Sequence, residues 1–178
     1  MKHLIFFLTF LRVILSPIIF LLIVIFNFYG VSLILFIFAA ASDFLDGYLA
    51  RKYNLVSELG GVLDPIADKI LIVFVLFGIS LVLGSSYVGF VGSIILAREF
   101  WVGALRDLNA RNNNLSATKV SFLAKLKTSI QFLAFSGFLI GLYLENELII
   151  FISNFVLFLA LIITLQTGLS YTMASFKR

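Results

Sequence analysis

Residues 148–167 read LIIFISNFVLFLALIITLQT, a run without a charged side chain. About 20 such residues are what a helix needs to cross the hydrocarbon core of a bilayer. Further apolar runs, each with only a few charged residues, occupy residues 4–26, 31–50, 62–83, 87–105 and 120–143. All are too continuous in Leu, Ile, Val and Phe for a surface helix, and the alternation typical of barrel strands is absent. The sequence therefore predicts an all-α, polytopic membrane protein, a bundle of six transmembrane helices.

The composition excludes a soluble domain. Of the 178 residues, 62% are hydrophobic and 12% charged, with a mean hydropathy of +1.14, whereas soluble domains are about half apolar and about a quarter charged. Six spans use nearly the whole chain, so we expect one domain over residues 1–178. The chain has no cysteine and one histidine, His3, which excludes disulfides and thiol catalysis and argues against a histidine-based site.

The basic residues predict the orientation. All 13 Lys and Arg residues fall at the two termini or at the second and fourth connections with their adjoining helix ends. The first and third connections carry no charge, and the fifth carries only Glu145 and Glu147. By the positive-inside rule, both termini face the cytoplasm. The basic pI then reflects topology and anionic lipids or substrates, and nucleic acid is not needed as a partner.

Four of the nine acidic residues cluster where the second predicted span ends and the third begins: Asp43, Asp46, Asp64 and Asp68. Each pair is spaced to share one face of a helix. Carboxylates suit hard cations such as Mg²⁺, and two such ions can hold a diphosphate for displacement at phosphorus. Pro65 suits a first helical turn with Asp64 as the N-cap. The alternative is a chance group of solvated helix-end acids.

Residues 43–51, DFLDGYLAR, and 60–68, GGVLDPIAD, together match D-x2-D-G-x2-A-R-x8-G-x3-D-x3-D. This pattern resembles the signature of the CDP-alcohol phosphatidyltransferase family. The resemblance implies six transmembrane helices, a homodimer and a cytoplasm-facing site with two Mg²⁺ ions, for which Mn²⁺ can substitute. It also implies that Asp43 and Asp64 bridge both metals, that Asp46 binds one, and that Asp68 binds the other and accepts a proton.

The same resemblance implies that Gly47, Arg51 and Ser57 contact the CDP-lipid, with Arg51 near its diphosphate. One departure is in residues 6–12, FFLTFLR, where Phe6 stands in place of the usual Asn. This departure weakens the case for Thr9 as a nucleotide contact. A second, smaller one is Ala124 in place of glycine.

The acceptor alcohol is sought in the second half of the chain. Residues 95–106, ILAREFWVGALR, and 124–131, AKLKTSIQ, resemble the family branch that uses glycerol 3-phosphate. That branch transfers the phosphatidyl group of CDP-diacylglycerol and releases CMP. Independently, a phosphate dianion needs Lys or Arg donors, and the candidates are Arg98, Arg106, Lys125 and Lys127.

Several alternatives remain open on the residues alone. Arg106, Lys125 and Lys127 could be topology determinants, and Arg98 could pair with Glu99 or Asp107. The acceptor could be inositol phosphate or serine. A polyprenyl transferase also holds a diphosphate with aspartates but lacks the G-x2-A-R-x8-G frame, and a cation channel would place its acids near mid-membrane. Gly137 and Gly141 form a G-x-x-x-G pair that could bring two helices close.

Overall fold

The structure is a computed structural model that describes residues 2–52, 58–112 and 122–176. Within these ranges, the side chains of residues 2–6, 43–52, 58–62, 64–65 and 122–125 lie outside the description. The described part is helical and contains no strand. Its six helices are α1 (Lys2–Val24), α2 (Tyr29–Lys52), α3 (Glu58–Leu83), α4 (Ser86–Arg111), α6 (Phe122–Tyr143) and α7 (Glu147–Phe176). The predicted helical bundle is confirmed.

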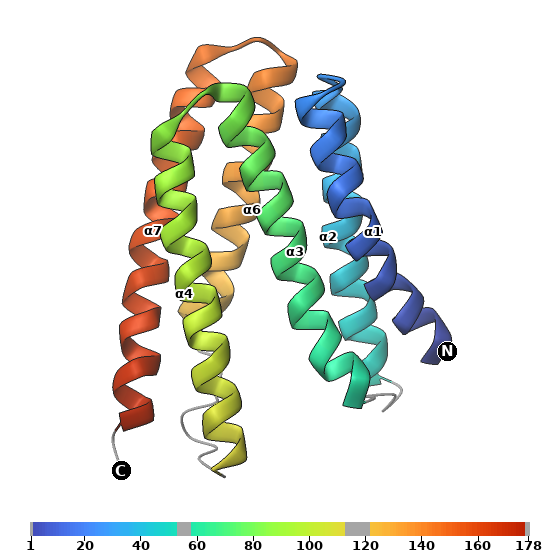
Figure 1. The fold of residues 1–178 in the computed structure, drawn as a ribbon, viewed down its shortest axis with the longest axis vertical. Helices are drawn as coiled ribbons and strands as arrows, with labels where there is room; N and C mark the ends of the chain where they lie inside the picture. The colour runs from blue at the N-terminus through green and yellow to red at the C-terminus, as the bar shows by residue number, and fades with distance from the viewer. Residues whose placement is uncertain (1, 53–57, 113–121, 177–178) are drawn as a thin grey trace.

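The helices run up and down along one long axis (Figure 1). The α1–α2, α3–α4 and α6–α7 turns lie at one end, and the chain termini lie toward the other. Each of these turns contains a residue with positive φ: Asn27 at 54°, Gly84 at 56° and Glu145 at 52°. A left-handed residue reverses the chain over a few positions. These are the breaks that the sequence predicted.

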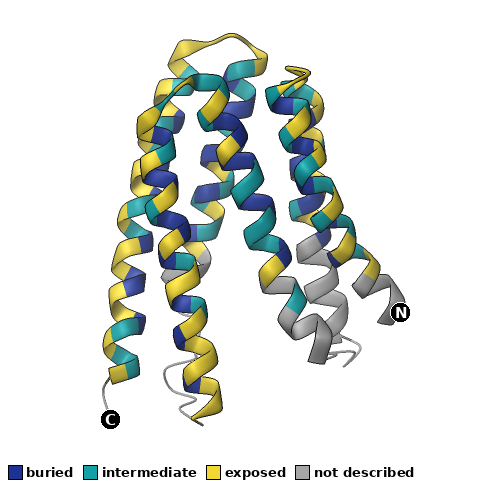
Figure 2. Cartoon of the chain, in the orientation of Figure 1, coloured by how far each residue is buried: buried dark blue, intermediate teal, exposed yellow. Residues whose placement is uncertain are grey.

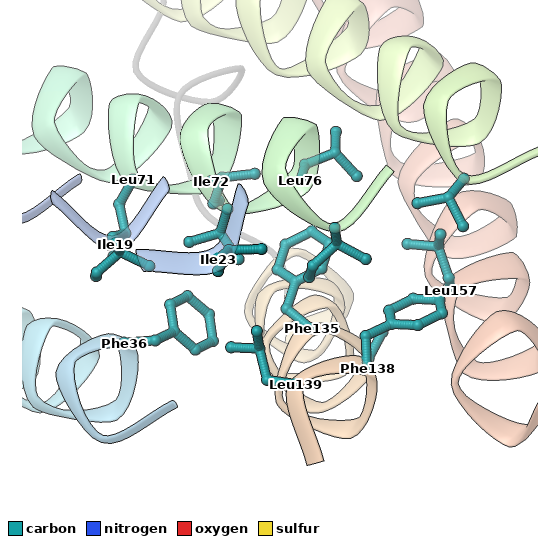
Figure 3. Close-up of a cluster of buried hydrophobic side chains, with 14 of the residues drawn as sticks. Ile19, Ile23, Phe36, Leu71, Ile72, Leu76, Phe135, Phe138, Leu139 and Leu157 are labelled. Carbon is teal, nitrogen blue, oxygen red and sulfur yellow. The ribbon is translucent and has the colours of Figure 1, made fainter. Parts of the chain in front are cut away.

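The core joins residues from all the helices of the bundle (Figure 3). Ile19 and Ile23 of α1 meet α2 and α3, and Phe36 of α2 stacks on Phe132 of α6 at a ring distance of 4.9 Å. Further helix contacts are α6 with α7, α4 with α7 and α3 with α4. The bundle is therefore continuous from its first helix to its last.

The outward faces of the helices are exposed (Figure 2), and many of the side chains exposed there are large and apolar. Phe151 is 71% exposed and Phe90 is 68% exposed, as are many other large apolar side chains. Five helices, α1, α3, α4, α6 and α7, contain segments long and apolar enough to cross a bilayer. The apolar part of α2 that the structure describes, Tyr29–Ser42, is shorter. Length and composition make the chain an integral membrane protein.

Two helices continue well past the C-terminal ends of the predicted spans. The last helix continues to Phe176, beyond the predicted end at residue 167, and α4 continues to Arg111, beyond residue 105. Asn109 explains part of both extensions, because its side-chain amide donates to the Leu105 carbonyl and to Ser175 Oγ, each at 2.7 Å. The first contact lies within α4, and the second joins the ends of α4 and α7 beyond the apolar runs.

Candidate active site

The four aspartates lie on two helices at the end of the bundle where α2 ends and α3 begins. Asp43 and Asp46 lie on the last turns of α2, and Asp64 and Asp68 lie on α3. Both pairs are on continuous helix, so each pair shares a face as its spacing predicted. The side chains of Asp43, Asp46, Asp64 and Arg51 lie outside the described part of the structure, and so do the surroundings of Gly47. Ser57 lies outside the described residues altogether.

The expected N-cap at Asp64 is wrong. The third helix begins at Glu58, so Asp64 and Pro65 lie inside it. A proline inside a helix removes one backbone donor, and membrane helices tolerate this loss. Pro17 lies inside α1 in the same way. Pro65 is therefore an interior position of α3, and Asp64 and Asp68 follow an existing helical turn.

The carboxylate of Asp68 forms an ion pair with Nη1 of Arg12 on α1. The Arg12 side chain is fully buried, whereas that of Asp68 is 45% exposed. Thr9, one turn earlier on α1, is also buried and lines a cavity of about 50 Å³ with Leu63 and Ile66 of α3. Asp68 thus connects a buried cation of α1 to the more open side of α3.

A second polar cluster lies among α4, α6 and α7. Oε1 of Glu99 accepts from Nη1 of Arg98 at 3.1 Å and also forms an ion pair with Nζ of Lys127. Nη2 of Arg98 donates to Oγ1 of Thr167 on α7 at 2.5 Å. Arg98 and Lys127 are each only 7% exposed. Two cations from different helices are therefore buried around one carboxylate oxygen.

The cluster continues one helical turn further into the bundle. Nε2 of Gln131 on α6 donates to Oγ1 of Thr164 on α7 at 3.2 Å, and both side chains are buried. Thr167 also donates to the Ile163 carbonyl at 2.8 Å. Buried polar groups are usually hydrogen-bonded, and of these contacts the one between Gln131 and Thr164 joins α6 to α7.

Lys69 of α3 reaches α4, the helix that carries Arg98 and Glu99. Its Nζ lies 5.2 Å from the centroid of the Phe100 ring on α4. It also occupies the space beside Gly103, where an added Cβ would come within 2.7 Å of Nζ. A cation over an aromatic face is favourable. Lys69, which follows Asp68 directly, thereby attaches α3 to α4 next to Glu99.

A sequence model of the CDP-alcohol phosphatidyltransferase family matches residues 3–166. The chain belongs to this family. A CDP-diacylglycerol–glycerol-3-phosphate 3-phosphatidyltransferase of Rickettsia typhi is 39% identical over 98% of the chain and 97% of its own length. Relatives with the same name are 36% identical in Wigglesworthia glossinidia brevipalpis, over 79% of the chain and 75% of the relative, and 31% identical in Yersinia enterocolitica, over 83% and 79%.

Family membership favours phosphatidyl transfer over the polyprenyl transferase and channel alternatives. In this phosphatidyltransferase, two of the four predicted acceptor residues, Arg98 and Lys127, come together. Arg98 does pair with Glu99, one of the partners that the sequence left open. Arg106 is exposed two turns further along α4, and the side chain of Lys125 lies outside the described residues.

The sequence predictions gave no site role to Arg12, Lys69, Glu99 or Thr167. Charges within apolar runs were an available signal for Arg12 and Glu99, because a charge is costly in hydrocarbon unless it has a partner. Lys69 was visible only as the residue after Asp68. Thr167 closes an uncharged run, and nothing in its surroundings in the sequence marks it as the partner of a residue on α4.

Proposed function

We propose that the chain transfers the phosphatidyl group of CDP-diacylglycerol to glycerol 3-phosphate, which yields phosphatidylglycerophosphate and CMP. The observation that carries the choice of acceptor is the buried pair Arg98 and Lys127, which share one oxygen of Glu99. Two cations and one carboxylate leave a net positive charge, which suits a phosphate dianion. An acceptor such as serine, which has no phosphate, would gain less from this arrangement.

We propose two Mg²⁺ ions as cofactors, with Mn²⁺ as a substitute. Asp43 and Asp64 would hold both ions, Asp46 one and Asp68 the other. The donor set fits, because it consists of carboxylates on two consecutive helices, and the carboxylate that the structure describes, Asp68, is partly exposed. When bound, the ions supply positive charge that offsets the diphosphate and the departing CMP.

The chain's own groups would orient and deprotonate the acceptor. Asp68 takes the proton of the sn-1 hydroxyl of glycerol 3-phosphate. The hydroxyl oxygen forms a bond to the phosphorus that carries diacylglycerol, and the bond from this phosphorus to the CMP oxygen breaks. Arg98 and Lys127 hold the acceptor phosphate, with Arg106 and Lys125 as further candidates. Gly47, Arg51 and Ser57 would contact the CDP-lipid.

The finer location is part of the same proposal. We place the chain in the inner or plasma membrane of a bacterial cell, with the active site and both termini in the cytoplasm, because the basic residues gather at that end. Membrane lipids surround the apolar helix faces, and a homodimer follows from the family resemblance. No nucleic acid partner is proposed.

CMP release from CDP-diacylglycerol by the purified protein tests the reaction. Glycerol 3-phosphate should support release, and inositol phosphate, serine and glycerol should each support at least about tenfold less, the rate difference that corresponds to about 1.4 kcal/mol. EDTA should abolish release, and added Mg²⁺ or Mn²⁺ should restore it. Equal or higher release with another alcohol would overturn the acceptor assignment, and release that persists in EDTA would overturn the metal assignment.

A further inference from the structure

Glu99 is the only residue in the described part of the chain that the structure shows bonded to both Arg98 and Lys127. One of its oxygens, Oε1, serves both cations. Its side chain is 17% exposed, so it retains some access to solvent while its two partners have almost none. The carboxylate is therefore the most solvent-accessible member of this group of three charged side chains.

The charges explain why such a carboxylate is needed. Arg98 on α4 and Lys127 on α6 are both buried, and two like charges in a poorly solvated site repel each other. Without an anion between them, the two side chains would separate toward solvent or the site would lose a charge. Glu99 keeps both cations side by side before any ligand arrives.

Arg98 is held from its other side by α7. Thr167 accepts from Nη2, and Gly168 packs against the stem of the side chain, where an added Cβ would lie 3.0 Å from Cγ and 3.1 Å from Nε. Among the described residues, the buried Nε of Arg98 has no hydrogen-bond partner. Glu99 and Thr167 thus fix the guanidinium, while its Nε remains without a hydrogen-bond partner.

We propose that Glu99 is a positioning residue for acceptor recognition, which holds Arg98 and Lys127 together as a preformed receptor for a phosphomonoester. Thr167 and Gly168 complete the support from α7. This inference rests on the proposed function and adds to it a residue that does not itself bind the phosphate. Because a carboxylate repels a phosphate, Glu99 itself adds no attraction for the ligand. It helps by holding Arg98 and Lys127 in place, which reduces the conformational entropy that these side chains lose when the phosphate binds.

Steady-state kinetics of CMP release test this role. Glu99→Gln should raise the KM for glycerol 3-phosphate at least about tenfold, equivalent to about 1.4 kcal/mol of binding, and should leave the KM for CDP-diacylglycerol within about twofold. Glu99→Asp should recover part of the loss. Gly168→Ala, which removes no charge but crowds Arg98, should raise the same KM. Glu145→Gln, an exposed carboxylate in the α6–α7 turn, is the matched control and should change neither constant.

Equilibrium binding of radiolabelled glycerol 3-phosphate separates this inference from the proposed function. Wild-type protein that binds the phosphomonoester but does not transfer to it would overturn the proposed function alone, and weaker binding by Glu99→Gln would still support the positioning role. Unchanged binding by Glu99→Gln would show that Glu99 contributes nothing to recognition, and tighter binding would show that it only competes with the ligand; either result would overturn the inference. Wild-type protein that binds no phosphomonoester would overturn both.

Discussion

Arg12 is a charged side chain with no exposed surface, within an otherwise apolar stretch of α1. Its partner Asp68 lies on α3, so the ion pair ties together two helices that also pack along their length. A buried charge without its partner is strongly unfavourable. The contact therefore contributes to the α1–α3 interface as well as to the placement of the proposed proton acceptor.

We expect Arg12→Met to lower the free energy of unfolding by about 2–3 kcal/mol. This is less than the roughly 3–5 kcal/mol typical of a broken buried pair, because Asp68 is partly exposed and water can solvate it. Unfolding in detergent micelles, followed by circular dichroism, measures the loss. Arg12→Lys should retain part of the stability, and Arg111→Met, at an exposed position of α4, is the control. Equal stability of Arg12→Met and wild type would show that the pair contributes nothing.

At the scale of a helix pair, Gly137 and Gly141 account for the close approach of α6 and α7. A Cβ at Gly137 would come up against Oγ of Ser153, and one at Gly141 would lie 2.7 Å from Cγ1 and 3.1 Å from the backbone nitrogen of Ile150. The prediction that this G-x-x-x-G pair brings two helices close is confirmed. Small residues at such interfaces let backbones meet where lipid supplies no hydrophobic drive.

Gly141→Ala should destabilise the bundle by about 1–3 kcal/mol, because the new methyl group meets backbone that cannot move without its helix. Thermal unfolding in detergent provides the measurement. Gly78→Ala is the matched control, since its Cβ would meet only side-chain atoms of Ile23, none nearer than 3.3 Å, and alanine favours a helix by about 1 kcal/mol over glycine. A loss at Gly78 as large as the loss at Gly141 would contradict the packing argument.

Helix number could be predicted from the sequence, but helix ends could not. An apolar run marks where a chain leaves lipid, whereas a helix continues as long as its backbone bonds and side chains allow. The last helix passes the polar Ser170 and ends at Phe176, and Asn109 binds Ser175 where hydropathy gives no signal. The predicted N-cap at Asp64 was wrong because Pro65 is only a local signal for the start of a helix. The helix α3 already begins at Glu58, about a turn and a half earlier.

The candidate site, like the helices, has features that could be predicted from the sequence and features that could not. Fixed spacing placed the aspartate positions on two consecutive helices, because spacing within a helix is a local property. Arg98 and Lys127 could be named as cations that an anionic acceptor needs, and Glu99 as one possible partner of Arg98, but the second contact of Glu99, with Lys127, could not be predicted. That contact joins α4 to α6 and depends on how the whole bundle packs. Long-range pairs of this kind are absent from any single stretch of sequence.

For the whole molecule, the charge distribution predicts how the protein is oriented in the membrane. The fourth helix, α4, has 26 residues and is therefore about 39 Å long at 1.5 Å per residue, enough to cross a hydrocarbon core of roughly 30 Å. Its first residue, Ser86, and its C-cap, Asn112, are both exposed and lie at opposite ends of the bundle (Figure 1). The two ends of this one helix can therefore be used to test which side of the membrane each end faces.

Single-cysteine variants should reveal that orientation. The chain has no cysteine of its own, so only the introduced residue can be labelled. In intact cells, a membrane-impermeant maleimide should label Ser86→Cys and leave Asn112→Cys unlabelled. After permeabilisation, both should react, because both positions are exposed and differ only in the side of the membrane that they face. We expect the Asn112 end to face the cytoplasm because the basic residues gather at that end. Labelling of Asn112→Cys, but not Ser86→Cys, in intact cells would show that the topology is the reverse of the predicted one. The four aspartates would then lie at the outer side of the membrane.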